Sequence, residues 1–571
     1  MVGIFSKVNQ WYNRYNDNRI FLFCITIPWI IYVMVLALFM LKRGYISFES
    51  NDDVFLNIIS SGALGHKYSM NIYNNIVFGW MLTVLYSISY EHNWLTIVQY
   101  CIVFSGYIFL GVSNIYRNKI VKGYFTNFIL LWSTVFTMIC HMNYSKTGAF
   151  SIVVGLFIMG VSLESEKYET IIHRIIQIIA SIYIFVGGLM RKETLYAVAP
   201  FILIYASYFF IKYKKNTIKR IIPFIIVCAS LVFAWFGNEI VYRTDPDWKY
   251  FVEYNKVRTK VVDYGVPSYD EYNEEYEAIG LNRNDVVMLD NWQYADTDVF
   301  SIEKLEEIVK IRDNNREKQK FRDIVEMIGR AFVVFAGKYS IIYVFLFLFL
   351  ALNIGTNSFP FRFRLLTIGL GIVEILGLLL IGRAPERAIV SAALATSILL
   401  LFYVENESSS VNKWIQIVCL GLIGGYAYFG NSYTLIEETY ENINYDKTNS
   451  TAFFSYINSH EDNIYVISVG YESLFLSEYS PLDHVNKFPQ ANVVLSGGWP
   501  IPSPAYMDII EEYGNKRNLF KVLAENDNVY WVVPGDFEKD PFVYYMQYHY
   551  DVYPVIVDSF GDNYNVVAFY N

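Results

Sequence analysis

Charged side chains are scarce in this chain. Asp, Glu, Lys and Arg make up 17% of its 571 residues, whereas apolar residues, counting Tyr and Trp, make up 54%, and the mean hydropathy is +0.28. This composition excludes a soluble globular protein of this length and indicates an integral membrane protein. The net charge of -9 comes mainly from two polar blocks, 242–328 and 431–571. Nothing in the charge pattern suggests nucleic acid as a partner.

Cysteine is also scarce and unevenly placed. All five cysteines fall within apolar runs, so both polar blocks lack a thiol: Cys24, Cys101, Cys140, Cys228 and Cys419. A disulfide framework and a cysteine-based metal site are therefore excluded. The chain also has no internal repeat and neither the Walker nor the dinucleotide-binding glycine pattern. The segment "SGGWPIPSP" in the second block is interpreted as a loop and not as a phosphate cradle.

Long apolar runs are plentiful. A transmembrane helix needs about 20 mostly apolar residues. The first run lacks a small-residue cleavage site and exceeds the length of a signal-peptide core, so it is expected to remain as the first helix. The second is short and closely followed by "EHN", and we expect it to be re-entrant or interfacial, which predicts about 11 to 12 transmembrane helices with eleven preferred. The runs are 20–41, 76–90, 94–112, 124–140, 147–163, 175–190, 195–211, 221–237, 339–352, 365–381, 388–404 and 414–430.

Lys and Arg in short loops predict the orientation, because positively charged loops tend to stay cytoplasmic. The basic loops are the N-terminus, 117–122, 212–220 and 362–364. Placing them inside puts the N-terminus in the cytoplasm and both polar blocks outside the cell. The expected organisation is a transmembrane module (1–242) with a catalytic first outer loop (42–75), an extracytoplasmic loop (243–330), further transmembrane helices (331–430) and an extracytoplasmic domain (431–571).

The two outer blocks differ in their patterns. The first is expected to begin extended at "RTDPDWKYFVEY" and to end in a helix, where Ile302, Leu305 and Ile308 form an apolar stripe. The last block alternates short β-type runs with helical pieces, which predicts a small α/β domain.

Charged residues gather at the outer ends of the predicted helices. Charges at membrane depth cost a few kcal/mol each, roughly, and usually mark pathways or sites. Widely separated parts of the chain bring these charges to one face of the membrane, which is the strongest functional signal in the sequence. They are Asp52, Asp53, His66, Lys146, Arg191, Lys192, Glu193, Arg383, Glu386 and Arg387.

The chemistry that these groups suit is group transfer from a lipid phosphate. Nucleotide sugars are absent outside the cell, so a donor there must arrive on a lipid carrier. The arginine fork suits a phosphate anion. A carboxylate could take the proton of an acceptor hydroxyl while the cations hold the departing charge. Neighbours on a helix point about 100° apart, so we favour Asp53 as the base and Asp52 as its partner or a helix-start acid, with the reverse order left open.

Each of these groups also has a purely structural interpretation. Tandem aspartates at a helix start commonly cap the helix and compensate its dipole. "MRKET" fits an ordinary loop with inverted topology, and "GRAPER" fits a turn on lipid headgroups. His66 has no ligand-type neighbours apart from the acids, so a metal site there is only a weak candidate.

The layout and three motifs resemble the GT-C superfamily of membrane glycosyltransferases that use polyprenyl-phosphate-linked sugars. The motifs "ESNDDVFLNIISSGALG", "YNKVRTKVVDYGVPSYDEYNEEYEAIGL" and "GRAPER" are similar to those of a group of bacterial envelope-polysaccharide membrane proteins. The resemblance implies a catalytic Asp in the first outer loop, here Asp52 or Asp53. It also implies cations that grip the lipid phosphate near the outer helix ends, here Arg191, Lys192, Arg383 and Arg387. Some members need a divalent metal ion and others do not, and the absence of a further DxD in this loop leaves that question open.

The leading functional hypothesis is a hexosyl- or pentosyltransferase of the bacterial cytoplasmic membrane that acts on a cell-envelope glycan or a lipid-linked acceptor at its outer face. Lys146, Glu193 and Arg258 complete the candidate binding set. The first alternative is a polysaccharide polymerase of O-antigen or capsule type, which relies on outer-loop arginines and needs no acid pair. The second is a transporter or flippase for lipid-linked sugars, which Glu374 within the run 365–381 favours. A non-catalytic scaffold is the third.

Overall fold

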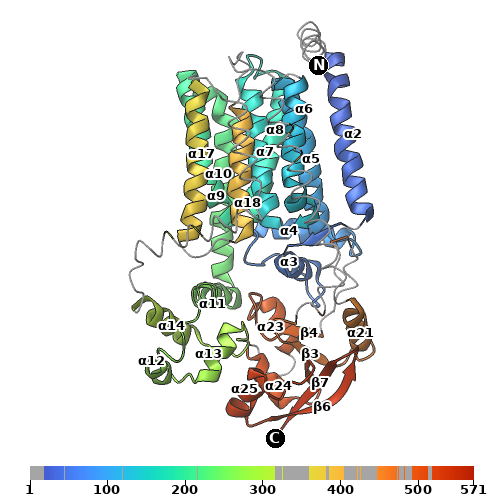
Figure 1. The fold of residues 1–571 in the computed structure, drawn as a ribbon, viewed down its shortest axis with the longest axis vertical. Coiled ribbons are helices and arrows are strands. Elements are labelled where there is room, and N and C mark those ends of the chain that lie inside the picture. The colour runs from blue at the N-terminus through green and yellow to red at the C-terminus, as the bar shows by residue number, and fades with distance from the viewer. Residues whose placement is uncertain are drawn as a thin grey trace.

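The computed structural model describes most of the chain. The described residues are 19–43, 45–49, 51–118, 120–214, 217–314, 325, 329, 359–380, 385–403, 421, 425, 447–471, 474, 481–482, 492–511 and 517–571. They form a bundle of long helices with two polar domains at one end of it, and the N-terminal end of the described chain lies at the opposite end (Figure 1).

The bundle is built from the predicted apolar runs. Eight of the described helices are long and apolar enough to cross a membrane, so the chain is a multi-pass membrane protein, as its composition predicts. A ninth helix, α18 (Glu386–Phe402), has 17 residues and is buried along almost its whole length. The predicted run 339–352 lies outside the described residues, as does the run 414–430 apart from residues 421 and 425. The long helices are α2 (Arg19–Arg43), α5 (Trp94–Asn118), α6 (Ile120–Val135, continued by the π-helical turn Phe136–Cys140), α7 (Tyr144–Glu164), α8 (Ile171–Met190), α9 (Lys192–Tyr213), α10 (Thr217–Thr244) and α17 (Phe359–Leu380).

Helix α7 is the centre of the bundle, with nearly every residue buried. Small residues let it approach α8 closely: a Cβ atom on Gly155 would stand 2.7 Å from the carbonyl oxygen of Ala180, and one on Gly187 would stand 2.6 Å from that of Gly148. Close backbone approach through small residues is how membrane helices gain packing contacts without a hydrophobic driving force.

The first outer loop folds at the polar end of the bundle. Strand β1 (Ser47–Phe48) pairs in parallel with β2 (His141–Met142), and helix α3 (Asn51–Ser61) follows. Helix α4 (Ile76–Ile88) has only 13 residues, about 20 Å at 1.5 Å per residue, which is too short for a hydrocarbon core of about 30 Å. It lies across the end of the bundle (Figure 1). The expectation that this run does not span the membrane agrees with its length.

The regular elements in the described part of the first polar block are all helices, joined by turns and irregular segments. They are α11 (Pro246–Val262), α12 (Asn273–Ala278), α13 (Arg283–Asp290) and α14 (Ile302–Asn314). The expected extended start was wrong, because Asp245 caps α11 by accepting from the backbone N–H groups of Asp247 and Trp248, and a proline occupies the first helical position. The predicted stripe is present in α14, where Leu305 and Ile308 are buried.

The last block forms the predicted α/β domain. Its five-stranded sheet has the order β4-β3-β5-β7-β6, with β3 parallel to β4 and β5, and β7 antiparallel to β5 and β6. The strands are β3 (Ile464–Ile467), β4 (Val493–Leu495), β5 (Val529–Pro534), β6 (Tyr553–Phe560) and β7 (Tyr564–Tyr570). The helices are α21 (Lys447–Asn458), α23 (Pro504–Glu511), α24 (Leu519–Glu525) and α25 (Pro541–Tyr550).

A buried carboxylate joins the two polar blocks. Asp296 of the first block accepts hydrogen bonds from Asn518 Nδ2 at 2.7 Å, Tyr545 OH at 2.8 Å and Tyr550 OH at 2.5 Å, all in the last block. His549 Nε2 on α25 lies 2.7 Å from Asp285 Oδ1 on α13. The two blocks therefore form one assembly over the end of the bundle.

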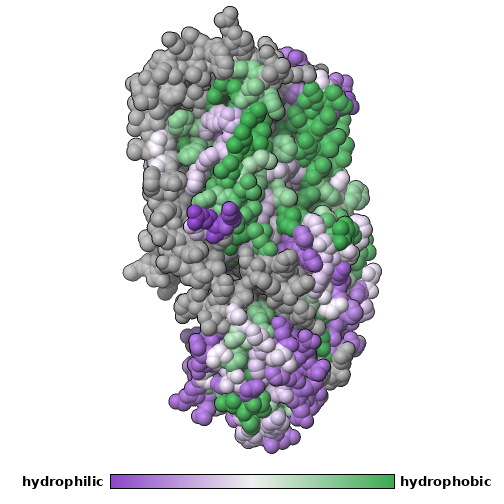
Figure 2. Space-filling model, turned by 90° about the vertical axis from the view of Figure 1, so that its right-hand side faces the viewer, coloured by the Kyte–Doolittle hydropathy of each residue, from purple (hydrophilic) through white to green (hydrophobic). Residues whose placement is uncertain are grey.

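The described basic loops share the opposite end of the bundle. Glu164 at the end of α7 pairs with Arg117 at the end of α5 (2.7 Å) and with Lys212 near the end of α9 (2.6 Å), and Arg220 near the start of α10 donates to the carbonyl of Leu163. Apolar side chains predominate on the coloured part of the bundle surface in Figure 2, with some hydrophilic patches among them, and hydrophilic side chains predominate over the polar domains. The molecule thus has one basic end and one end that carries both polar blocks.

Candidate functional site

Four of the described helices begin near one point at the polar end of the bundle. They are α3, α7, α9 and α18, and their first residues carry charged or hydroxyl side chains that meet there. Asp52 Oδ2 on α3 lies 2.9 Å from Arg387 Nη1 on α18 and 4.0 Å from Arg191 Nη1, which directly precedes α9. Together with Glu193, these residues are called the charge cluster below. The side chains of Asp52, Arg191 and Arg387 are 8%, 11% and 22% exposed.

Arg191 is held in a fixed orientation. Its Nη1 donates to Tyr144 OH at 2.6 Å and to Ser145 Oγ at 2.9 Å, and its Nε donates to Glu193 Oε2 at 3.0 Å. The guanidinium carbon also stands 5.0 Å from the centre of the Tyr73 ring, within range of a cation–π interaction. The fork is therefore anchored on its helix side by neutral hydroxyls, which leave its charge to be matched by carboxylates or by a ligand.

Asp53 points away from the cluster and into the protein. It is fully buried, and its Oδ1 accepts from Gln99 Nε2 and from the backbone N–H of Tyr144, both at 2.9 Å. Burial raises the pKa of Asp53 from its ordinary 3.8 to about 8, against the lowering effect of the Gln99 hydrogen bond. The carboxyl is therefore mostly neutral at pH 7. Of the two neighbours, it is Asp52 that faces the cations. This geometry favours Asp52 as the base, whereas the sequence pattern favoured Asp53 and left the reverse order open.

Two of the predicted cations are engaged elsewhere. Lys146 is fully buried, with its Nζ 2.8 Å from Glu49 Oε2 and 2.8 Å from the carbonyl of His141, so it ties α7 to the β1–β2 pair. Lys192 Nζ lies 2.9 Å from Glu239 Oε1 in a half-exposed pair between α9 and α10. Both residues lie at the end of the bundle that carries the polar blocks, but neither contacts the charge cluster.

The remaining candidates fall into three situations. Glu193 contacts Arg191 while its own side chain is 62% exposed. Arg383 lies outside the described residues. His66 is exposed, and no group of three His, Cys, Asp or Glu residues in the described parts of the chain is placed to hold a metal ion.

Arg258 belongs to the polar assembly and lies close to the charge cluster. It is 2% exposed, its Nη1 lies 3.1 Å from Asp263 Oδ1, and its guanidinium carbon is 5.5 Å from the ring centre of Trp292. Tyr73 links it to the cluster: burial and the negative charge of Asp52 raise the pKa of Tyr73, the positive charges of Arg258 and Arg191 lower it, and the net pKa is about 12. Arg258 and the cluster therefore act on the same side chain.

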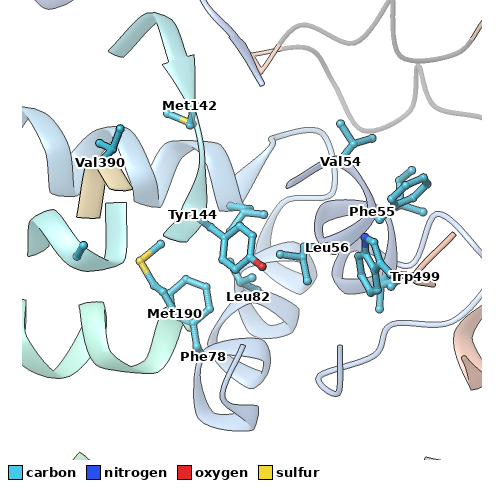
Figure 3. Close-up of a cluster of buried hydrophobic side chains, with 14 of the residues drawn as sticks. Val54, Phe55, Leu56, Phe78, Leu82, Met142, Tyr144, Met190, Val390 and Trp499 are labelled. Carbon is cyan, nitrogen blue, oxygen red and sulfur yellow. The ribbon is translucent and has the colours of Figure 1, made fainter. Parts of the chain in front are cut away.

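Two segments of the polar assembly meet beside Tyr73. Residues 292–295 and 496–499, called the roof below, are joined by hydrogen bonds from Ala295 N to Ser496 O and from Gly498 N to Trp292 O, both 3.1 Å. A Cβ atom on Gly497 would stand 1.8 Å from the carbonyl oxygen of Trp292, so only glycine fits there. The Trp499 ring lies 4.6 Å from that of Tyr73 and 6.0 Å from that of Phe55, centre to centre. Figure 3 shows Trp499 beside Phe55 of α3.

Sequence patterns did not identify the uncharged residues of the site. Tyr73, Tyr144, Ser145 and Gln99 are common residue types at the ends of apolar runs, and only the polar segment "NYSKTG" between two such runs marks the start of α7. Trp499 lies in "SGGWPIPSP", which the sequence marked correctly as a loop but not as part of a site.

A cleft of about 340 Å³, counted to its open mouth, lies at the far end of the same loop. It is lined by Asp247, Pro502, Pro504, Met507, Asp508, Glu511 and Arg517. None of the charge-cluster residues lines it. The loop therefore has one end beside Tyr73 and the other on this cleft.

Comparison with known proteins yields one structural likeness. No protein-family model and no curated protein sequence matches the chain. Among solved structures, the chain is similar to the crystal structure of ArnT from Cupriavidus metallidurans bound to undecaprenyl phosphate, with 12% identity and a TM-score of 0.42, over 95% of this chain and 98% of that one. A likeness at this level concerns the general layout and carries no argument about activity.

Proposed function

We propose that this protein is a membrane glycosyltransferase that transfers a sugar from a polyprenyl-phosphate carrier to a cell-envelope glycan or another acceptor. The observation that carries the proposal is the convergence of Arg191 and Arg387 on Asp52. These arginines are distant in the sequence, come from different helices and meet in a largely buried place at the membrane end of the polar assembly.

The charge cluster suits a lipid phosphate for two physical reasons. Helix N-termini carry partial positive charge, and four of them begin beside the cluster. Two guanidinium forks add donors in the geometry that phosphate oxygens accept. Arg191 is already oriented by Tyr144 and Ser145, so binding an anion there costs little additional ordering.

Asp52 is the proposed general base. A phosphate that takes the place of Asp52 on Arg387 leaves this carboxylate free beside the reacting centre. The acceptor oxygen then attacks the anomeric carbon while the bond from that carbon to the phosphate oxygen breaks. Asp52 takes the hydroxyl proton, and the bonding electron pair leaves with the phosphate, whose charge Arg191 and Arg387 stabilise. The outcome is inversion at the anomeric carbon.

The proposed orientation places this chemistry outside the cell. The basic loops at the far end of the bundle favour a cytoplasmic position for that end, which puts the charge cluster at the outer face of a bacterial cytoplasmic membrane. Donors there must be lipid-linked, as the charge cluster requires.

The test combines binding and activity in the full-length protein. Undecaprenyl phosphate is added to the protein in nanodiscs and binding is measured by native mass spectrometry. We expect Arg191→Ala and Arg387→Ala to weaken binding about tenfold or more, since each removes a charge-assisted contact. Asp52→Asn should retain binding but lower envelope glycan formation in cells by about 10²- to 10⁴-fold, the usual contribution of a general base.

The matched control is Arg312→Ala, which removes a partly exposed arginine of α14 and should change neither measurement. Wild-type protein that does not bind undecaprenyl phosphate would contradict the proposal. Full activity of Asp52→Asn combined with loss of activity in Arg258→Ala would favour the polymerase instead.

A further inference from the structure

Three buried polar atoms around the roof have no hydrogen-bond partner among the residues that the structure describes. They are Trp499 Nε1, Gln293 Oε1 and Arg258 Nε, and these residues are 6%, 5% and 2% exposed. Nearly all buried polar groups in proteins are hydrogen-bonded, so each exception requires an explanation. Two donors and one acceptor from separate segments in one place indicate a site that a polar ligand completes.

The position of this group relative to the charge cluster is set by Tyr73. One neighbour of Tyr73 is Arg191, whose guanidinium carbon is 5.0 Å from the ring centre, and another is Trp499, with its ring centre at 4.6 Å. Arg258 acts electrostatically on the same phenol. Tyr73 therefore lies beside both Arg191 of the charge cluster and Trp499 of the roof.

We propose that Trp499, Gln293, Arg258 and Tyr73 form the subsite for the sugar ring of the donor, and that this sugar is uncharged. The inference rests on the proposed function and adds the substrate class of the same site. The indole and guanidinium N–H groups donate to sugar hydroxyls, the amide oxygen of Gln293 accepts from one, and the Tyr73 ring offers an apolar surface to the C–H face of the ring. Asp263 already pairs with Arg258 at 3.1 Å, so the subsite does not require an acidic sugar.

Entry of the sugar requires the contact between Trp499 and Tyr73 to open. Because backbone hydrogen bonds join the two roof segments, Trp499 and Gln293 move together. The sugar thus replaces an aromatic contact with hydrogen bonds to both segments at once. Recognition of the sugar is therefore coupled to the position of the whole polar assembly.

The experiment compares the affinity for the lipid phosphate alone with the affinity for the same lipid phosphate carrying a sugar. Binding of undecaprenyl phosphate, undecaprenyl-phosphoryl-glucose and undecaprenyl-phosphoryl-mannose to the full-length protein in nanodiscs is measured for wild type, Trp499→Phe and Gln293→Met. In wild type, we expect at least one glycosylated lipid to bind about tenfold more tightly than undecaprenyl phosphate. Trp499→Phe and Gln293→Met should each lose most of this difference and bind undecaprenyl phosphate as wild type does.

Trp235→Phe is the control for replacing a buried indole, since Trp235 Nε1 donates to the carbonyl of Gly188 within the bundle; it should keep the full difference. The inference is overturned if neither sugar adds affinity in wild type, or if the added affinity survives in both roof variants. Failure of undecaprenyl phosphate itself to bind overturns the proposed function, which is a different result.

Discussion

Asp52 and Asp53 are neighbours in the sequence with opposite environments. Asp52 faces two arginines. Asp53 is fully buried against the start of α7, and burial raises its pKa. We predict that Asp53→Asn folds and remains active, because an amide keeps the acceptor for Gln99 and for the Tyr144 N–H. Asp53→Ala should lower the free energy of unfolding by about 1–3 kcal/mol, since it leaves buried donors unsatisfied. Thermal unfolding of the purified variants measures this difference, and equal stability of the two would contradict it.

The same carboxyl predicts a pH effect. Its pKa rises from 3.8 to about 8 on folding, so between these values the folded protein binds more protons than the unfolded chain. Stability therefore falls as pH rises through this window and levels off above about 8. Asp53→Asn should match wild type near pH 4 and unfold at a temperature higher by about 2 °C or more at pH 8.5. Parallel pH profiles of the two proteins would show that Asp53 does not titrate in this way.

At this scale the sequence indicated which charged residues share one end of the bundle, and it did not indicate which of them touch. Asp52, Arg191 and Arg387 were expected at the outer helix ends, and the structure brings them together. Lys146 has the same placement in the pattern but turns toward Glu49. The direction of a side chain around its helix depends on packing between distant elements, and an apolar run of membrane helix carries little periodicity that reveals it.

At the scale of elements, the buried pair of Lys146 and Glu49 fastens α7 to the two-residue strand β1. Removing one partner leaves an uncompensated buried charge, which typically costs about 3–5 kcal/mol, whereas replacing both is often tolerated. We predict that Lys146→Met strongly lowers the unfolding temperature and that the double variant Glu49→Gln with Lys146→Met recovers most of the loss. The control is Lys192→Met, whose pair is half exposed and should matter little to stability. No recovery in the double variant would contradict a role for charge pairing.

The elements themselves were largely predictable. Apolar runs of about 20 residues identify membrane helices because an unsatisfied backbone is not tolerated in lipid. The short run that became α4 was recognised by its length. The start of α11 was missed because tyrosine and charged residues suggested extended chain, although the Asp245–Pro246 pair is a helix-start signal.

At the scale of the whole molecule, the structure has one basic end and one end with both polar blocks. Single cysteines are introduced into a cysteine-free background and labelled with a membrane-impermeant maleimide in spheroplasts. We predict labelling of Asn273→Cys and Lys539→Cys, both exposed in the polar assembly, and labelling of Glu166→Cys, exposed at the opposite end, only after permeabilisation. Outside labelling of Glu166→Cys would place the charge cluster in the cytoplasm and contradict the proposed orientation.

The contact between the two polar blocks could not be predicted from the sequence. Asp296, Asn518 and Tyr545 look like ordinary surface residues in the chain, and only the folded arrangement shows that they form a buried joint. Contacts between distant polar residues leave no periodic pattern, so composition and spacing do not reveal them.

The side chains of Asp52 and Arg191 are about nine-tenths shielded from solvent, and Tyr73 beside Arg191 packs against Trp499 of the roof. For a glycosyl carrier held beneath it, this shielding excludes stray water as a competing nucleophile. The covering domain would then prevent wasteful hydrolysis of an activated lipid, so that the anomeric bond breaks only when an acceptor is in place.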